Sequence, residues 1–214
     1  GIQAEIARRE AEGTTIFMLK ACYSILESAR NQLEELEKEG IETQVIQVGG
    51  KAIHGCVGCG GCAQTGRCVF DDGVNEWVDQ LEQADGILVG TPVYYAGMNG
   101  TLKCFLDRAF YSRGRKMRHK VAAAVAAVRR TGGMTALEDI NRFFTISEML
   151  VVSSNYWNVI HGSKPGEAQQ DLEGQQIMRL LGKNMAWMLK MREMAGQQAG
   201  EPEKEKKIGM NFIR

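Results

Sequence analysis

The chain lacks several features that mark common classes of function. No apolar run approaches the roughly 20 residues that a membrane-spanning helix needs, so no membrane partner is predicted. The 26 basic and 26 acidic residues give a formal net charge of zero, which offers no support for a nucleic-acid-binding surface. Only three histidines are present, and no nucleophile stands beside a base in the pattern that covalent catalysis uses. No catalytic acid, base or nucleophile is therefore assigned.

The start of the chain also lacks an export signal. Residues 1–12 are charged and have no apolar core of the kind found in signal peptides. We therefore expect a cytoplasmic protein, in which a reducing environment disfavours structural disulfides. With no internal repeat and no break in composition, we expect an N-terminal extension at 1–13, one domain at 14–194 and a polar tail at 195–214.

Cysteine, by contrast, is concentrated in a glycine-rich loop at 55–68. Thiolates so close together repel one another and oxidise readily, so they usually hold a soft metal or form disulfides. An iron–sulfur cluster fits four thiolates, whereas zinc usually takes two cysteine pairs separated by a longer loop. Reduced thiols or two disulfides are the plain alternatives. Cys22 and Cys104 are expected to be small core residues. The four clustered thiols, spaced C-x2-C-x2-C-x5-C, are Cys56, Cys59, Cys62 and Cys68.

Short β-rich runs alternate with helical stretches along the chain, which is typical of a parallel sheet with helices on both faces. The expected strands are Thr14–Leu19, Thr43–Val48, Gly86–Gly90, Val121–Val128 and Leu150–Ser153. The expected helices are Cys22–Gly40, Leu102–Tyr111, Thr135–Phe144 and Gly174–Met194, together with one that Asp71 or Asp72 caps and that runs through Leu81. The pattern predicts an α/β fold, namely a flavodoxin-like three-layer α/β/α sandwich with a five-stranded parallel sheet of order 2-1-3-4-5.

In that topology a ligand sits beyond the carboxyl ends of the strands. The cysteine loop follows the second strand, so it is expected on the same edge of the sheet. Two tyrosines follow the third strand, where they can offer ring faces to a flat cofactor. Twin glycines follow the fourth strand and expose backbone donors, and the neighbouring arginines can face a phosphate or an electron-rich ring edge. Tyrosines packed on the next helix, and solvated arginines in an ordinary turn, are the alternatives. The candidate cofactor-binding residues are Thr91, Pro92, Val93, Tyr94, Tyr95, Gly97, Arg129, Thr131, Gly132 and Gly133.

From about Thr14 to about His161, the sequence resembles the NADPH-dependent FMN reductase family of flavodoxin-like flavoproteins, and most closely its iron–sulfur flavoprotein branch. The resemblance is carried by the cysteine motif ending in Thr65-Gly66-Arg67-Cys68, by Thr91-Pro92-Val93-Tyr94-Tyr95, and by Leu102-Lys103 with Phe105-Leu106-Asp107-Arg108. It implies FMN at the carboxyl ends of the strands, with residues 91–97 and 129–133 around the isoalloxazine ring. It also implies a [4Fe–4S] cluster beside the flavin.

The sequence differs from the family pattern after the first strand. In the family a longer loop there grips the FMN phosphate, whereas here Lys20 and Ala21 lead directly into Cys22. Two residues can join a strand to a helix, but they cannot also wrap a phosphate with several backbone N–H groups. No phosphate-binding residue is therefore assigned.

The expected function is a flavin-dependent electron-transfer oxidoreductase that carries FMN and a [4Fe–4S] cluster and exchanges electrons with NAD(P)H or a redox partner protein. One alternative is a cluster-free NAD(P)H-dependent FMN or quinone reductase, in which the cysteines are vestigial or bind zinc. Another is a non-enzymatic redox or metal sensor. The last helix carries more apolar residues than one face needs, which favours a homodimer or homotetramer.

Overall fold

The computed structural model describes residues 15–20, 32–210 and 212. Within them, seven strands form one sheet. Parallel pairing gives the order β2-β1-β3-β5-β6, while β7 also pairs with β5 and β4 turns back antiparallel to β3. The strands are β1 (Thr15–Lys20), β2 (Glu42–Gln47), β3 (Gly86–Tyr94), β4 (Gly97–Met98), β5 (Val121–Val128), β6 (Leu150–Val151) and β7 (Val159–His161).

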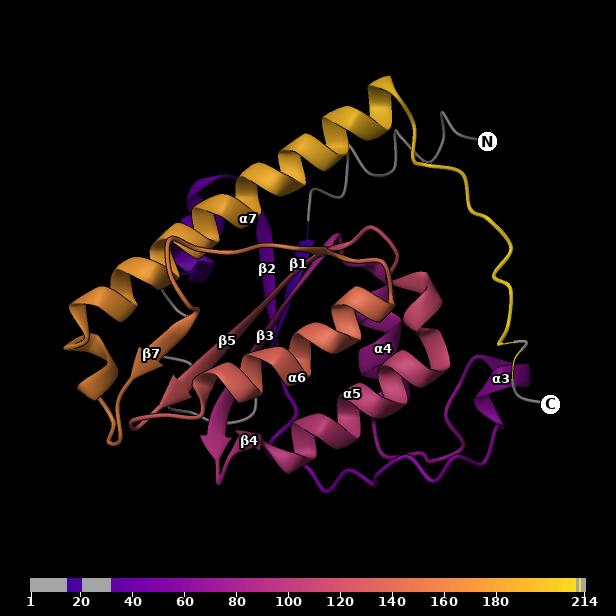
Figure 1. The fold of residues 1–214 in the computed structure, drawn as a ribbon, viewed down its shortest axis with the longest axis horizontal. Helices are drawn as coiled ribbons and strands as arrows, with labels where there is room; N and C mark the ends of the chain where they lie inside the picture. Colours follow the sequence, from indigo (N-terminus) through magenta and orange to yellow (C-terminus); the bar gives the residue numbers. More distant parts are fainter. Residues whose placement is uncertain (1–14, 21–31, 211, 213–214) are drawn as a thin grey trace.

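Helices cover both faces of this sheet (Figure 1). The main helices are α4 (Val74–Gln83), α5 (Gly100–Arg113), α6 (Gly133–Ile146) and α7 (Leu172–Gln198), and residues 32–38 are also helical. Shorter pieces are α3 (Cys62–Thr65), η1 (Gly114–Lys116) and η2 (Glu167–Gln169). Helices α4, α5 and α6 share a core with one face of the central strands, whereas α7 packs on the other. The predicted α/β fold is confirmed.

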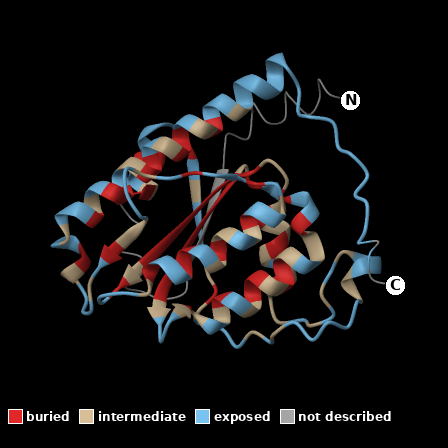
Figure 2. Ribbon diagram, in the orientation of Figure 1, coloured by how far each residue is buried: buried red, intermediate tan, exposed pale blue. Residues whose placement is uncertain are grey.

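The alternation of side chains along the central strands explains the two cores. In β3, Ile87 and Val89 pack under α4 and α5, whereas Leu88 packs under α7. Strand β5 reads VAAAVAAV and is buried along most of its length, and its small side chains let helices approach both faces. Figure 2 shows these buried strands between half-exposed helices.

The predicted five-stranded, wholly parallel sheet is wrong in detail. Its fifth strand, expected at Leu150–Ser153, is replaced by two short strands, β6 and β7, that both pair with β5. The third strand continues beyond Gly90 to Tyr94 and then forms a hairpin with β4. Pairing of β3 with β1 ends at Gly90, and on its other side β3 stays paired with β5 as far as Pro92, which lies opposite Ala127.

The predicted domain and helix boundaries can be compared with the structure at the two ends of the chain. Residues 1–13 lie outside the described residues, and so does the first part of the helix expected at Cys22–Gly40. Helix α7 runs on to Gln198, beyond the expected end at Met194, and residues 199–210 are exposed without regular secondary structure. No helix in the described part of the chain is long and apolar enough to cross a bilayer.

Candidate functional site

The carboxyl ends of β3 and β5 lie side by side and form the edge that we call the carboxyl rim. An open hollow of about 410 Å³ lies there, lined by Val93, Tyr95, Arg129, Arg130 and Thr131. We call it the rim hollow. The structure thus brings together both segments that the sequence analysis singled out, because parallel neighbours end at the same edge of a sheet.

The candidate cofactor-binding residues after the third strand differ in burial and in whether they line the rim hollow. Thr91 and Pro92 are buried inside β3 rather than in a loop. The Thr91 hydroxyl donates to the Pro92 carbonyl oxygen at 2.9 Å and accepts from the Asn99 N–H at 3.0 Å, so it ties the hairpin together. Gly97 is half-buried in β4. Only Val93 and Tyr95 of this group line the rim hollow.

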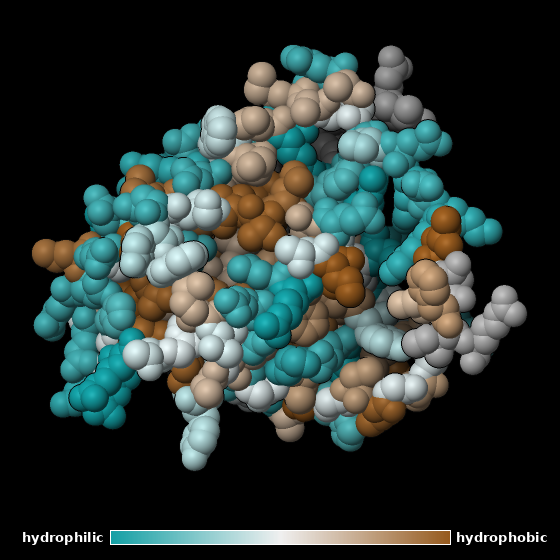
Figure 3. All heavy atoms as spheres, viewed as in Figure 1, coloured by the Kyte–Doolittle hydropathy of each residue, from teal (hydrophilic) through white to brown (hydrophobic). Residues whose placement is uncertain are grey.

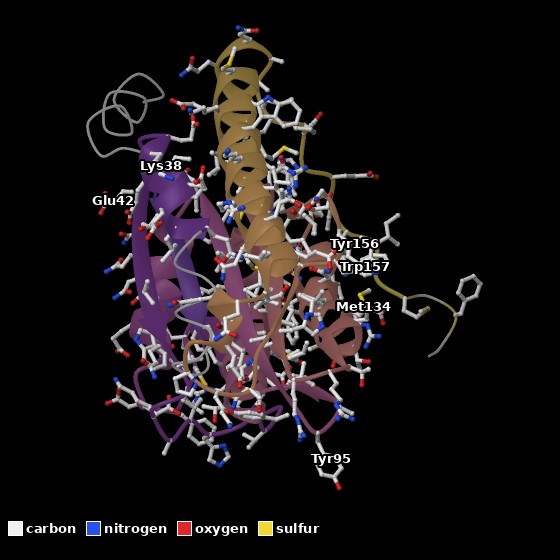
Figure 4. All side chains as sticks on the ribbon, turned by 90° about the vertical axis from the view of Figure 1, so that its left-hand side faces the viewer. Lys38, Glu42, Tyr95, Met134, Tyr156 and Trp157 are labelled. Atoms are coloured by element: carbon white, nitrogen blue, oxygen red, sulfur yellow. The ribbon has the colours of Figure 1, made fainter. Side chains whose placement is uncertain are left out.

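The two tyrosines differ in exposure, and only Tyr95 stands clear of the rest of the protein. Tyr94 is 54% exposed, and Tyr95 is fully exposed at the turn of the hairpin. Figure 4 shows Tyr95 projecting from the molecule. Its φ is +63°, a left-handed conformation that costs a residue with a side chain roughly 1–2 kcal/mol. A strained, exposed aromatic residue at the rim is a feature of functional sites.

The glycines predicted after the fourth strand form the start of α6. Gly132 is the N-cap residue with φ +91°, and a Cβ there would lie 2.9 Å from the Val93 Cγ1. A Cβ on Gly133 would lie 2.8 Å from the Val159 Cγ2. Both glycines therefore allow close packing of α6 against the strands. No side chain in the described part of the chain caps α6, so its first N–H groups can donate to another acceptor near the rim.

Positive charge gathers at the same place. Arg129 and Arg130 are both exposed and line the rim hollow. Among the described residues, no carboxylate forms an ion pair with either of them. An anionic group in the rim hollow would therefore meet two guanidinium groups that are not already neutralised.

A second hollow is lined by all four clustered cysteines, together with Arg108 and Tyr111 from α5. We call it the cysteine hollow. The thiols of Cys56, Cys59, Cys62 and Cys68 are free, so the alternative of two disulfides is not supported. Burial raises the pKa of the Cys62 thiol, and the charges of the neighbouring thiols add to this. As the described residues stand, no group of three or more His, Cys, Asp or Glu side chains is arranged to hold a metal ion.

Glycines shape the backbone around these thiols. Gly58 and Gly60 have φ of +65° and +74°, which a residue with a side chain adopts only at a cost. Gly61 has no room for a side chain, because its Cβ would lie 2.7 Å from the Val69 Cγ1. The loop thus turns tightly enough for sulfurs from both sides of α3 to line one hollow.

The cysteine hollow does not lie on the carboxyl rim, contrary to expectation, and it shares no lining residue with the rim hollow. The loop leaves the rim after β2 and runs along α5 instead. A Cβ on Gly55 would lie 3.6 Å from the Cys104 Sγ, so the half-buried Cys104 faces the loop. Arg108 is eight residues beyond Gly100, or about 12 Å along the helix axis.

Arg108 is the main residue that the sequence analysis missed. It was noted only as part of the family resemblance, yet it is 2% exposed and bonds to the cysteine loop at several points. The signal available in the sequence was its spacing with Phe105 and Ala109, which places a charged side chain on the buried face of α5. A buried arginine needs partners, and none could be identified from the sequence.

The principal partner of Arg108 is Asp72, which follows the cysteine loop. The Nη2 of Arg108 donates to the Asp72 Oδ1 at 2.7 Å, and Nη1 donates to Oδ2. The hydrogen bonds from Arg108 hold the pKa of Asp72 below its usual value, although burial acts in the opposite direction. The Asp72 carboxylate also accepts from the His54 N–H at 3.2 Å, so it joins the two ends of the loop.

This pair predicts an acid-sensitive loop. Because the folded-state pKa of Asp72 is lowered, its contribution to stability is complete above the unfolded pKa of about 4 and is lost as the pH falls through the lowered value. We expect Asp72→Asn to lower the thermal midpoint near pH 7 and to make it less dependent on pH in the acid range. Calorimetry of both proteins from pH 7 to pH 3 checks this, and an equally steep acid loss in the variant would contradict it.

The fold and the rim hollow together define a flavodoxin-like α/β protein. A WrbA-like flavodoxin from Agrobacterium tumefaciens has a solved structure that superposes with a TM-score of 0.59 at 17% identity, over 84% of this chain and 99% of that one. This similarity shows the fold alone.

Similarity in sequence shows the family. The family model described as NADPH-dependent FMN reductase matches residues 21–164. An iron–sulfur flavoprotein from Methanocaldococcus jannaschii is 37% identical over 170 residues, covering 76% of this chain and 88% of the relative. Another, from Methanosarcina thermophila, is 29% identical over 174 residues, covering 79% and 88%. The chain belongs to the NADPH-dependent FMN reductase family, in its iron–sulfur flavoprotein branch, and is an FMN-dependent oxidoreductase.

Proposed function

We propose that the protein transfers electrons between FMN in the rim hollow and a [4Fe–4S] cluster in the cysteine hollow. The observation that carries the proposal is that four thiols spaced C-x2-C-x2-C-x5-C line one hollow. When bound, FMN supplies a centre that exchanges a hydride with a nicotinamide and single electrons with a metal cluster.

The rim residues would bind and orient the flavin. Val93 and Tyr95 would contact the isoalloxazine ring, and the first N–H groups of α6 and the backbone at Gly132 would donate hydrogen bonds to it. Arg129 and Arg130 would face its electron-rich edge or an anionic donor, because neither arginine has an acidic partner among the described residues. The family binds the phosphate just after the first strand, and in this chain the residues that follow β1, 21–31, lie outside the described residues.

The cysteine loop would hold the cluster with Cys56, Cys59, Cys62 and Cys68. The donor set fits, since thiolates are the ligands that iron–sulfur clusters take, and the glycine turns bring all four to one hollow. Cys56 and Cys59 are exposed, so the cluster would lie near the surface. That position suits exchange of electrons with NAD(P)H-reduced flavin on one side and a redox partner protein on the other.

The test is reconstitution of the anaerobic protein with FMN, iron and sulfide. We expect one FMN and about four iron and four sulfide per chain, with the broad visible absorption of a cluster. NADPH and NADH are then added separately, and loss of the flavin and cluster absorption is followed in time. FMN without iron would favour the cluster-free reductase, and bound zinc or thiols with no flavin would favour a metal or redox sensor.

We also propose that the chain forms a homodimer or homotetramer. Helix α7 buries Met178, Leu181 and Met185 on the sheet, yet Trp187 is 62% exposed and Met194 58% exposed. Further aromatic side chains, Tyr156 and Trp157, lie exposed next to each other (Figure 4). On the face seen in Figure 3, apolar residues lie among hydrophilic ones rather than in one continuous area. Exposed tryptophan and methionine are typical of subunit interfaces.

We expect Trp187→Glu to shift the mass in solution toward that of a single 23.7 kDa chain, because a charge at a buried interface is costly. Light scattering over a range of protein concentrations measures this. Leu172→Glu is the control, since Leu172 is also apolar, is 79% exposed and is the first residue of α7, far along the helix from Trp187. A wild-type protein that stays at 23.7 kDa at high concentration would refute the proposed assembly.

A further inference from the structure

Arg108 uses all of its donors on the cysteine loop and on the residues that flank it at both ends. Its Nε donates to the Cys68 Sγ at 3.1 Å. Its Nη1 donates to the His54 carbonyl oxygen at 3.1 Å, its Nη2 donates to the Phe70 carbonyl oxygen at 3.2 Å, and each of them also donates to one oxygen of Asp72. A guanidinium group has five N–H donors, so every one of them has a partner.

These contacts join both ends of the cysteine loop to α5. His54 precedes the first clustered cysteine, whereas Cys68 is the last and Asp72 follows it. The guanidinium also lies 5.3 Å from the centre of the Phe70 ring. The Arg108 side chain is buried, with 1% of its surface exposed. Its geometry is therefore set by the fold, since each N–H would lose a partner if the guanidinium turned.

Within the described residues, Cys68 has the one clustered thiol that accepts from a charged donor. The Cys68 sulfur faces the cysteine hollow and accepts from a buried cation. Hydrogen bonds to the sulfurs of a cluster raise its reduction potential, because they stabilise the more negative, reduced state. Residues that orient a metal ligand commonly alter metal affinity by roughly 10- to 100-fold when they are replaced.

We propose that Arg108 is a positioning residue for the cluster: it holds Cys68 toward the hollow and raises the reduction potential through the Nε–H···Sγ hydrogen bond. This inference rests on the proposed cluster and adds to it a residue that is not a ligand. A lysine could not replace it, because three donors on a flexible stem cannot reproduce five donors in a planar fork.

Helix α5 also provides a matched control. Arg113 is five residues further on, its side chain is 15% exposed, and it too anchors the cysteine loop. Its Nε donates to the Gly66 carbonyl oxygen at 2.8 Å, and its Nη1 binds Asp79 and Glu82. Arg113 therefore resembles Arg108 in charge, burial and loop contact, but it makes no hydrogen bond to sulfur.

The experiment compares reconstituted wild-type protein with Arg108→Gln, Arg108→Lys and Arg113→Gln. Circular dichroism and FMN content report folding, iron per chain reports loading, and a redox titration followed by electron paramagnetic resonance gives the midpoint potential. We expect both Arg108 variants to retain less iron, by roughly tenfold or more under a competing chelator, and to have lower midpoint potentials. Arg113→Gln is expected to keep the wild-type potential.

A second measurement uses the wild-type protein, so its result does not depend on whether a variant folds. Wild-type protein is grown with arginine labelled with ¹⁵N in the guanidino group, and pulsed electron paramagnetic resonance is recorded on the reduced cluster. A ¹⁵N coupling is expected, because among the described residues only Arg108 donates a side-chain hydrogen bond to a clustered thiol.

Four outcomes overturn the inference. If folded Arg108 variants load fully and keep the wild-type potential, or if the labelled protein shows no ¹⁵N coupling, Arg108 has no role toward the cluster while the proposed function stands. If Arg113→Gln lowers the potential as much as Arg108→Gln does, the effect comes from anchoring the loop rather than from the bond to sulfur. A wild-type protein that takes up no cluster refutes the proposed function itself, and the inference with it.

Discussion

Replacing Cys68 with serine is expected to abolish stable cluster binding, with iron per chain falling to about a tenth of the wild-type value or less after anaerobic reconstitution. A serine hydroxyl is a hard oxygen ligand, whereas iron–sulfur clusters are held by soft thiolates. The same change at Cys56, Cys59 or Cys62 is expected to act in the same direction, because all four thiols line one hollow. Iron, sulfide and visible absorption are measured on each variant.

Cys104→Ser is the control for these variants. Cys104 is a half-buried free thiol that faces the loop at Gly55 but does not line the cysteine hollow. It is expected to retain the full iron content. If all four single variants at the clustered cysteines keep the visible absorption, they do not ligate a cluster, and the cluster-free reductase replaces the proposed function.

Gly132→Ala is expected to weaken FMN binding and to destabilise the protein. At φ +91° a side chain costs roughly 1–2 kcal/mol, and the new Cβ would lie 2.9 Å from Val93, which lines the rim hollow. Either Val93 or the start of α6 must move, and both belong to the proposed flavin site. A loss of about 1.4 kcal/mol in binding is a tenfold rise in Kd. Titration of apo-protein with FMN, followed by flavin fluorescence, measures it.

Gly100→Ala is the control for Gly132→Ala, and Gly100 is the first residue of α5. No atom lies within 4 Å of its Cβ position and its φ is not positive, so Gly100→Ala is expected to leave FMN binding unchanged and the thermal midpoint equal or slightly higher. Wild-type affinity in Gly132→Ala, with a melting temperature equal to that of Gly100→Ala, would show that the start of α6 does not shape the flavin site.

Much of the fold followed from local patterns in the chain. The apolar runs at Gly86–Gly90 and Val121–Val128 predicted central strands, and both are buried. The close spacing of the four cysteines predicted that their sulfurs could face one object, and they line one hollow. These patterns repeat over a few residues, because side chains two apart in a strand, or three to four apart in a helix, share a face.

Other features depended on neighbours that are distant along the chain. The apolar run predicted that the third strand ends at Gly90, but pairing with β5 extends it, for example at Pro92 opposite Ala127. The loop after β2 was expected on the rim, but contact with α5 carries it away. Each of these depends on packing between separate elements, which overrides local preference.

By itself, the sequence determined the class of fold, the thiols that can serve as ligands, and the two segments that meet at the carboxyl rim. Only the tertiary structure decided that the rim hollow and the cysteine hollow are separate, and that Arg108 joins the cysteine loop to α5. The partners of Arg108 lie 36 to 54 residues away from it. Hydrogen bonds between groups so far apart exist only once the chain has folded, and no spacing along the chain encodes them.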